Sequence, residues 1–166
     1  YFSSVFTAEN LTNIPMAEKI FQGEEEEELS WIKIDAEIVR NKLLKLRSDK
    51  AMGADEISPR LLVEIRQEIC YPLTRIFIKS LEEGRVPQDW RIANVSPLFK
   101  KGSRSKAENY RPVSLTSQIC KTFESIIRDQ IVDHLEKLKL IKESQHGFRR
   151  GRSCLTNLFI ALDKVT

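Results

Sequence analysis

Positively charged side chains gather in one short segment that also contains glycine and serine, residues 100–106. The segment stands between two strand-like stretches of sequence, and Arg111 follows inside the second of them. Cations held at the end of a β-hairpin can bind phosphate groups without reading bases. The pattern therefore predicts an anion-binding hairpin in which the second strand orients the Arg111 side chain. The alternative is that Arg111 forms a structural ion pair, and the sequence leaves it open.

A second basic segment, residues 145–153, combines glycines, an aromatic ring and three arginines. Gly147 and Gly151 let the backbone approach a ligand closely. Phe148 offers a stacking surface, and the arginines offer contacts to phosphate. Ser153 is a good N-cap, so the positive end of a helix is expected beside them. The alternative is a solvated turn whose Phe148 packs in the core.

No pattern in the sequence predicts metal binding or nucleophilic catalysis. His134 and His146 have no partner at metal-ligand spacing, so both are interpreted as structural. Cys70, Cys120 and Cys154 are isolated and odd in number, which argues against a secreted disulfide framework. We therefore expect a reducing intracellular environment, in the cytoplasm, the nucleus or both.

The chain has two parts that differ in composition, an acidic first part and a basic remainder that contains both segments. Residues 1–30 hold seven glutamates against one lysine, and the run Glu24–Glu28 repels itself. Residues 1–33 are accordingly interpreted as an acidic linker. The remaining residues, 34–166, are basic and bring the net charge of the chain to +3. A basic body favours a polyanionic partner such as nucleic acid, although surface solubilisation also explains the charge.

Apolar spacing predicts helices over the first half of residues 34–166. One helix is capped by Asp35. The next begins at Ser58 with Pro59 in its first turn, restarts at Pro72 and stops at Gly84. The predicted buried stripes consist of Ile34, Ile38, Leu43, Leu46, Leu62, Ile65, Ile69, Leu73, Ile76, Phe77 and Leu81.

Strand-like sequence follows at residues 92–99 and 110–115, on either side of the first basic segment. Pro97 and Pro112 restrict these stretches to edge or irregular strands. Two further helices are expected, the second over residues 155–165. The first of them carries Ile119, Phe123, Ile126, Ile127, Ile131, Leu135 and Leu138, a stripe that we expect to remain partly exposed.

The predicted fold class is therefore α+β and helix-rich, with one small antiparallel hairpin. Trp31 and Trp90 are interpreted as packing anchors rather than as platforms for base stacking. No stretch approaches the roughly 18 consecutive apolar residues of a membrane span, so no membrane partner is expected. The chain begins with Tyr1 and has no charged-then-apolar leader, so we expect a piece of a longer protein without a signal peptide.

Five segments, in this order, resemble motifs of reverse transcriptases from non-long-terminal-repeat retrotransposons. Residues 50–55 are similar to the Lys-Ala-x-Gly-Pro-Asp-Gly motif, and residues 86–91 are similar to the Val-Pro-x-x-Trp segment. Residues 97–102 and 109–115 resemble the first fingers motifs, and residues 145–153 resemble the second fingers motif. Each match is weak alone, but five in order with sensible spacing are specific, and the subgroup resembles chicken-repeat/jockey-type elements. The segments are residues 50–55, 86–91, 97–102, 109–115 and 145–153.

The resemblance implies the fingers part of a right-hand polymerase, with fingers and the start of a truncated palm in residues 34–166. It implies that Lys100 and Arg111 grip the triphosphate of an incoming deoxynucleotide. An RNA template and a DNA primer are the implied polymer partners, bound weakly and without sequence preference by these residues alone. The residues implied to line the template path are Gln145, Gly147, Phe148, Arg149 and Arg152.

The sequence departs from the family pattern in three places. Ala54 stands where the family usually has proline, and Glu56 where it usually has a glycine that permits positive φ. The third departure is that the family's catalytic aspartates, in a Tyr-Leu-Asp-Phe-like strand and a Phe/Tyr-Ala-Asp-Asp hairpin, do not occur, and Asp163 lies in helix-like sequence. The full-length family uses Mg²⁺ held by such carboxylates, so no Mg²⁺ site and no polymerase activity are expected in these residues alone.

Two functional hypotheses remain. The first is a fragment of an RNA-directed DNA polymerase that supplies nucleotide- and template-binding fingers. The second is a non-enzymatic nucleic-acid-binding or interaction module, a retroelement relic. An intact Tyr-Leu-Asp-Phe-like segment encoded downstream of Thr166 favours the first, whereas a stop codon or frameshift favours the second.

Overall fold

The computed structural model describes residues 1–5, 12, 14, 16, 23–24 and 28–163. Much of the predicted acidic linker lies outside the described residues, including three glutamates of the run Glu24–Glu28, and so do residues 164–166. The described chain divides into two compact units. The larger is built on Ser30–Arg128, and the smaller on residues 129–163.

The first helix of the larger unit, α1, spans Ala36–Leu44 and confirms the predicted cap. The Asp35 carboxylate accepts a 2.8 Å hydrogen bond from the backbone N–H of Ile38, which satisfies one of the unpaired donors at the helix start. Val39 and Leu43 are completely buried, and α1 packs against α3. Val39 was not in the predicted stripe, because helix periodicity alone does not fix which of two adjacent positions faces the core.

The next two helices, α2 at Pro59–Glu64 and α3 at Arg66–Glu83, meet at Ile65. The predicted restart at Pro72 is therefore wrong, because Pro72 lies inside α3. A proline within a helix removes one backbone hydrogen bond and costs about 3 kcal/mol. Cys70 and Leu73, on either side of Pro72, are buried, and their packing holds the helix through that position.

Helix α3 ends where predicted. Gly84 adopts φ 60°, its N–H donates to the Leu81 carbonyl, and the Arg85 N–H donates to the Ser80 carbonyl. This pair of bonds is the Schellman arrangement, which favours glycine at the left-handed position. Ile76, by contrast, was predicted in the buried stripe and is 42% exposed. The stripe that faces the core runs instead through Leu73 and Phe77, and Ile76 lies off it.

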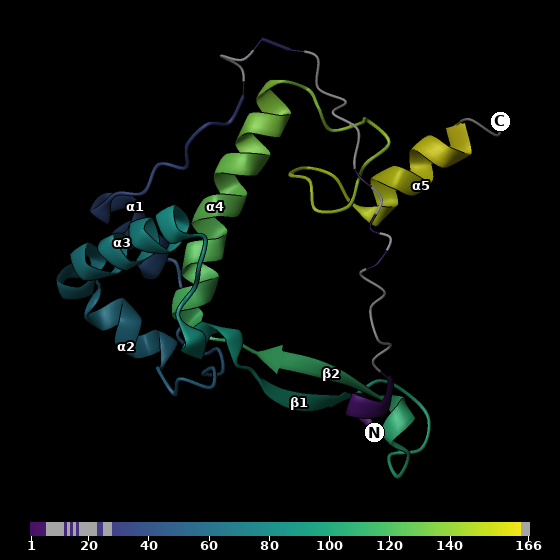
Figure 1. The fold of residues 1–166 in the computed structure, drawn as a ribbon. Coiled ribbons are helices and arrows are strands. Elements are labelled where there is room, and N and C mark those ends of the chain that lie inside the picture. Colours follow the sequence, from purple (N-terminus) through teal and green to yellow (C-terminus); the bar gives the residue numbers. More distant parts are fainter. Residues whose placement is uncertain (6–11, 13, 15, 17–22, 25–27, 164–166) are drawn as a thin grey trace. The chain divides into compact units, whose positions relative to one another are not determined.

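The only sheet in the described residues is a two-stranded antiparallel hairpin, β1 at Asn94–Phe99 and β2 at Tyr110–Leu115. Pro97 pairs with Pro112 in the register. Both strands are edge strands, so neither proline removes a hydrogen bond to a further strand. The 3-10 turns Gln88–Arg91 and Ala107–Asn109 lie before β1 and inside the hairpin loop. Figure 1 shows the hairpin extending away from α1, α2 and α3.

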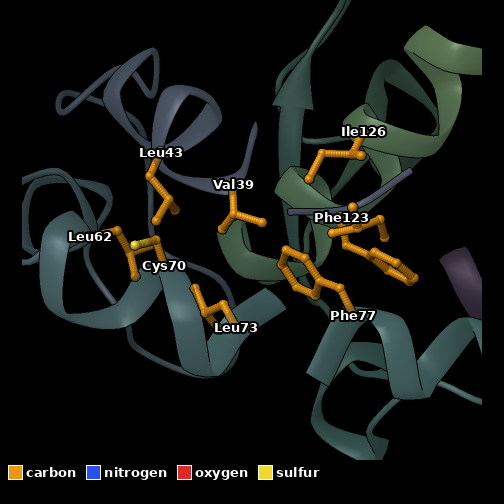
Figure 2. Close-up of a cluster of buried hydrophobic side chains, with 9 residues drawn as sticks. Val39, Leu43, Leu62, Cys70, Leu73, Phe77, Phe123 and Ile126 are labelled. Carbon is orange, nitrogen blue, oxygen red and sulfur yellow. The ribbon is translucent and has the colours of Figure 1, made fainter. Parts of the chain in front are cut away.

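The core of the larger unit is closed by the first half of α4, Gln118–Lys137. Figure 2 shows the buried cluster, in which the rings of Phe77 and Phe123 stack with centroids 4.9 Å apart. Trp90 meets Phe77 edge-on at 5.8 Å, which confirms it as a packing anchor. The same prediction for Trp31 is wrong, because its side chain lies in extended chain ahead of α1 and is 63% exposed.

The smaller unit contains the second half of α4 and α5, Cys154–Asp163. Ser153 is confirmed as the N-cap of α5, since its hydroxyl accepts a 3.2 Å hydrogen bond from the Thr156 N–H. No described side chain of α5 is buried, and Ile131 of α4 is 40% exposed. The expected exposed apolar surface is therefore present. Across the described chain, no helix is both long and apolar enough to cross a membrane.

Candidate nucleic-acid interface

The register of the β1–β2 hairpin brings Lys100 and Arg111 to one face. Arg111 pairs with Leu98, and the ladder continues past Phe99 through a 2.8 Å bond from the Lys100 N–H to the Asn109 carbonyl. Side chains alternate between the faces of a strand, so Lys100 follows Leu98 onto the face that carries Arg111. A diagonal pair of this kind lies within reach of long side chains. The two cations can therefore contact one polyanionic ligand together.

Both side chains are available to a ligand. Lys100 and Arg111 are exposed, and neither forms an ion pair among the residues that the structure describes. The alternative raised by the sequence, a structural ion pair for Arg111, is therefore not seen. Lys106, in the same loop, differs because its ammonium lies 3.7 Å from the Glu108 carboxylate.

Side-chain contacts fix the loop that carries the other cations. The Arg104 guanidinium lies over the Phe99 ring, 4.9 Å from its centroid, and the Arg104 carbonyl accepts a 2.9 Å hydrogen bond from the Tyr110 hydroxyl. The Asn109 side chain donates to the Ser103 carbonyl at 2.8 Å. It also lies so close to Gly102, where φ is 85°, that a side chain at this position would collide with it. The loop is thus a defined turn that places cations beside both faces of the hairpin.

The segment that resembles the Lys-Ala-x-Gly-Pro-Asp-Gly motif supports the base of the hairpin. Gly53 is buried against the backbone where β2 leads into α4, and a Cβ at Gly53 would lie 2.6 Å from Ser117 N. The buried Gln118 side chain donates to the Ala51 carbonyl at 3.1 Å. Sequence reasoning did not assign this contact, because it joins residues more than sixty positions apart.

Glu56 closes the turn of the same segment. Its N–H donates to the Gly53 carbonyl at 3.2 Å, and it adopts φ 55°. Glu56 therefore keeps the positive φ of the glycine that it replaces, in a left-handed region that suits glycine and disfavours other residues.

In the smaller unit, Phe148 does not pack in the core. It has φ 61°, and its side chain is fully exposed, so the core interpretation of this ring is wrong. The left-handed backbone at Phe148, next to Gly147, turns the ring toward solvent. Gln145 is also exposed, and its amide donates to the Gly147 carbonyl at 3.2 Å. Phe148 is consequently a ring that a nucleobase can stack on, a contact that contributes roughly 1–3 kcal/mol per base.

The arginines of this loop have different environments. The Arg149 Nε lies 3.4 Å from a Glu136 carboxylate oxygen, and its Nη1 donates to the Lys142 carbonyl. Arg150 is exposed, and Arg152 is half-buried. The structure therefore presents Phe148 and Arg150 outward but holds Arg149 against α4.

His146 is the residue that the sequence undervalued. It is 4% exposed, and its Nδ1 lies 2.8 Å from the Thr156 hydroxyl oxygen, so the loop is fastened to the first turn of α5. In the sequence, His146 stands seven residues before the Ser153 N-cap. That spacing alone does not predict a contact between the loop and α5.

No group of three His, Cys, Asp or Glu side chains that could hold a metal ion occurs within the described part of the chain. The hairpin of the larger unit offers exposed cations. The loop of the smaller unit separately offers an exposed aromatic ring, an exposed arginine and a capped helix start. Groups of these kinds are suited to contacts with phosphates and flat bases.

Two known proteins are similar to this chain over most of its length. No family model matches the chain. Over 125 residues, 74% of the chain, it is 30% identical to the probable RNA-directed DNA polymerase from transposon X-element of Drosophila melanogaster. Over 105 residues, 63% of the chain, it is 28% identical to the corresponding polymerase from transposon BS. The chain is thus similar to retrotransposon reverse transcriptases, and it spans only 14% and 12% of the length of these relatives.

Proposed function

We propose that the chain is the fingers portion of an RNA-directed DNA polymerase from a non-long-terminal-repeat retrotransposon of the chicken-repeat/jockey type. In this proposal, Lys100 and Arg111 bind the triphosphate of the incoming deoxynucleotide. The observation that carries it is their placement on one hairpin face, both exposed and without ion pairs among the described residues. An arginine fork and an ammonium together suit the several oxygens of a triphosphate.

The smaller unit is proposed to guide the template. Phe148 would stack on a base of single-stranded RNA, while Gln145 and the backbone of Gly147 lie beside the strand. Arg149 and Arg152 would contact phosphates, and Arg149 must leave Glu136 to do so. The similarity to two RNA-directed DNA polymerases supports this assignment. A function on template RNA also places the proposed site of action inside the cell, in the cytoplasm or the nucleus.

Triphosphate binding tests the first half of the proposal. A fluorescent deoxynucleoside triphosphate is titrated into the chain and into Arg111→Ala. The expected result is a loss of affinity of roughly 10- to 100-fold, since a charge-assisted hydrogen bond contributes roughly 1.5–3 kcal/mol. Lys106→Ala is the matched control, because it removes the same charge from the same loop but from a side chain already paired with Glu108. Equal effects of the two substitutions would contradict a specific role for Arg111.

RNA binding tests the second half. Fluorescence anisotropy with a labelled single-stranded RNA at several salt concentrations gives the number of phosphate contacts. If about four cations reach phosphates, log K falls against log salt with a slope of roughly −3. Replacing Arg149, Arg150 and Arg152 together by alanine is expected to flatten that slope and to weaken all sequences about equally. An unchanged slope in the triple variant would remove the second basic segment from the interface.

A further inference from the structure

A pocket of about 300 Å³ opens in the smaller unit beside the start of α5. Its lining includes the loop residues Glu143, Ser144, His146 and Arg152, and Asn157 from the first turn of the helix. The helix adds the positive end of its dipole to the charge of Arg152. The pocket is therefore polar on one wall and suited to a ligand with a negative group.

One buried atom in this wall has no hydrogen-bond partner. His146 is 4% exposed, and its Nε2 has no partner in the described structure, although its Nδ1 is bonded to Thr156. A buried polar atom that stays unpaired costs free energy, about 1–3 kcal/mol. In a pocket wall, a bound ligand can supply the missing partner.

The hydrogen bonds of Thr156 fix what that partner must be. Its hydroxyl donates its single hydrogen to the Ser153 carbonyl at 2.8 Å and accepts from the Ser153 N–H at 2.9 Å. Nδ1 of His146 must then be the protonated nitrogen that donates to Thr156. In the neutral ring the other nitrogen, Nε2, is left with a lone pair and can only accept. The missing partner is a donor such as a hydroxyl group.

We propose that the pocket receives the ribose of an RNA strand, whose 2′-hydroxyl donates to His146 Nε2 while the adjacent phosphate faces Arg152. A 2′-hydroxyl next to a phosphate is the feature that separates RNA from DNA. Glu143 on the pocket rim repels a second phosphate and accepts hydrogen bonds, which also favours a sugar. Because Nε2 has almost no solvent contact, the ribose reaches it only after a local rearrangement of the loop.

The inference rests on the proposed function, because it gives the template-binding loop a preference for ribonucleotides. The test compares the affinity of the chain for one sequence made as RNA, as 2′-fluoro RNA and as DNA. The 2′-fluoro strand keeps the RNA-like sugar conformation but cannot donate. RNA is expected to bind about fivefold more tightly than 2′-fluoro RNA, the ratio that one ordinary hydrogen bond provides.

His146→Ala is expected to abolish that ratio. Because His146 also fastens the loop to α5, the affinity for DNA is measured alongside and reports any general loss of contacts to phosphate. His134→Ala is the matched control, since His134 is the other histidine of the chain and does not line the pocket. It should retain the preference for RNA.

A spectroscopic measurement keeps the test decisive if His146→Ala does not fold. The ¹⁵N resonance of Nε2 in the unmodified chain is expected to shift with RNA and to stay in place with the 2′-fluoro strand. Equal affinity for RNA and 2′-fluoro RNA, or an unmoved resonance, would overturn the ribose site while leaving nucleic-acid binding intact. Failure to bind any of the three strands would instead overturn the proposed function itself.

Discussion

Arg149 and Glu136 form the one ion pair that joins the second basic segment to α4 in the described structure. The guanidinium Nε lies 3.4 Å from the carboxylate. The side chains are 19% and 35% exposed, so water partly screens the pair. The pair occupies the guanidinium that the proposed function assigns to a template phosphate. Under that proposal, Glu136 competes with RNA for Arg149.

Glu136→Gln is expected to strengthen RNA binding about two- to fivefold, because a partly exposed ion pair contributes roughly 0.2–1 kcal/mol that RNA no longer has to replace. Anisotropy at low salt measures the change. Asp133→Asn is the control, since it removes the same charge from the exposed surface of the same helix without touching Arg149. If both variants gain equally, general charge and not release of Arg149 is responsible.

Gly53→Ala is expected to destabilise the larger unit by about 1–3 kcal/mol, the usual cost of inserting an extra methyl group into a packed site. The new Cβ would lie 2.6 Å from the backbone of Thr116 and Ser117, which cannot move without shifting the base of the hairpin. Urea denaturation followed by circular dichroism measures the loss. Gly147→Ala is the control, because its nearest neighbour, the Gln145 side-chain amide, is 3.6 Å away. A Gly53→Ala variant as stable as this control would refute the close approach.

Glu56→Gly is expected to stabilise the chain by about 0.5–1 kcal/mol. Relief of the left-handed strain at φ 55° outweighs the greater freedom that glycine gives the unfolded chain. Arg75→Gly provides the opposite sign, because Arg75 is an exposed residue in the interior of α3, where glycine costs roughly 1 kcal/mol. Thermal denaturation of the unmodified chain and of the two variants measures both changes in stability. A loss of stability on Glu56→Gly would show that the Glu56 side chain contributes more than its backbone costs.

The three cysteine thiols are expected to differ in their reactivity toward an alkylating reagent. Burial, together with the nearby Glu124 carboxylate, raises the pKa of the Cys120 thiol to about 11, so little of the reactive thiolate forms at neutral pH. Cys70 is buried as well, whereas Cys154 is exposed. Iodoacetamide near neutral pH should therefore add one group to the folded chain and three to the unfolded chain, as read by intact mass. Rapid modification of Cys120 in the folded chain would contradict its burial.

The same shift gives stability a pH dependence with a definite sign. An unfolded thiol ionises near its ordinary pKa of 9.0, before the native thiol at about 11, so ionisation favours the unfolded state. The contribution of Cys120 is present below about pH 9 and is lost as the pH rises toward about 11. Cys120→Ala should lose less stability between pH 8 and pH 10 than Cys154→Ala does. Equal losses would show that the Cys120 thiol has no shifted pKa.

Local interactions account for the parts of the fold that could be predicted from the sequence. The Asp35 and Ser153 caps and the Gly84 helix end depend on residues a few positions apart. The β1–β2 hairpin joins two strands that follow one another directly in the chain. A cap requires only its own side chain and the next turn, and a proline-containing hairpin requires only that both strands be edges. The alternation of side chains along those strands also fixes the shared face of Lys100 and Arg111 once the register is known.

The tertiary structure decided what depends on distant neighbours. Helix α3 continues through Pro72 because buried side chains on both sides hold it. Trp90 rather than Trp31 is a packing anchor because the fold brings Phe77 and Phe123 against it. The role of Gly53 became visible only when the start of α4 came to lie against it. Likewise, the sequence supplied Arg149 and His146 as residue types, but only the folded loop pairs one with Glu136 and leaves one nitrogen of the other without a partner. Composition and spacing set which groups are present, whereas their pairing and burial depend on contacts between residues far apart in the chain.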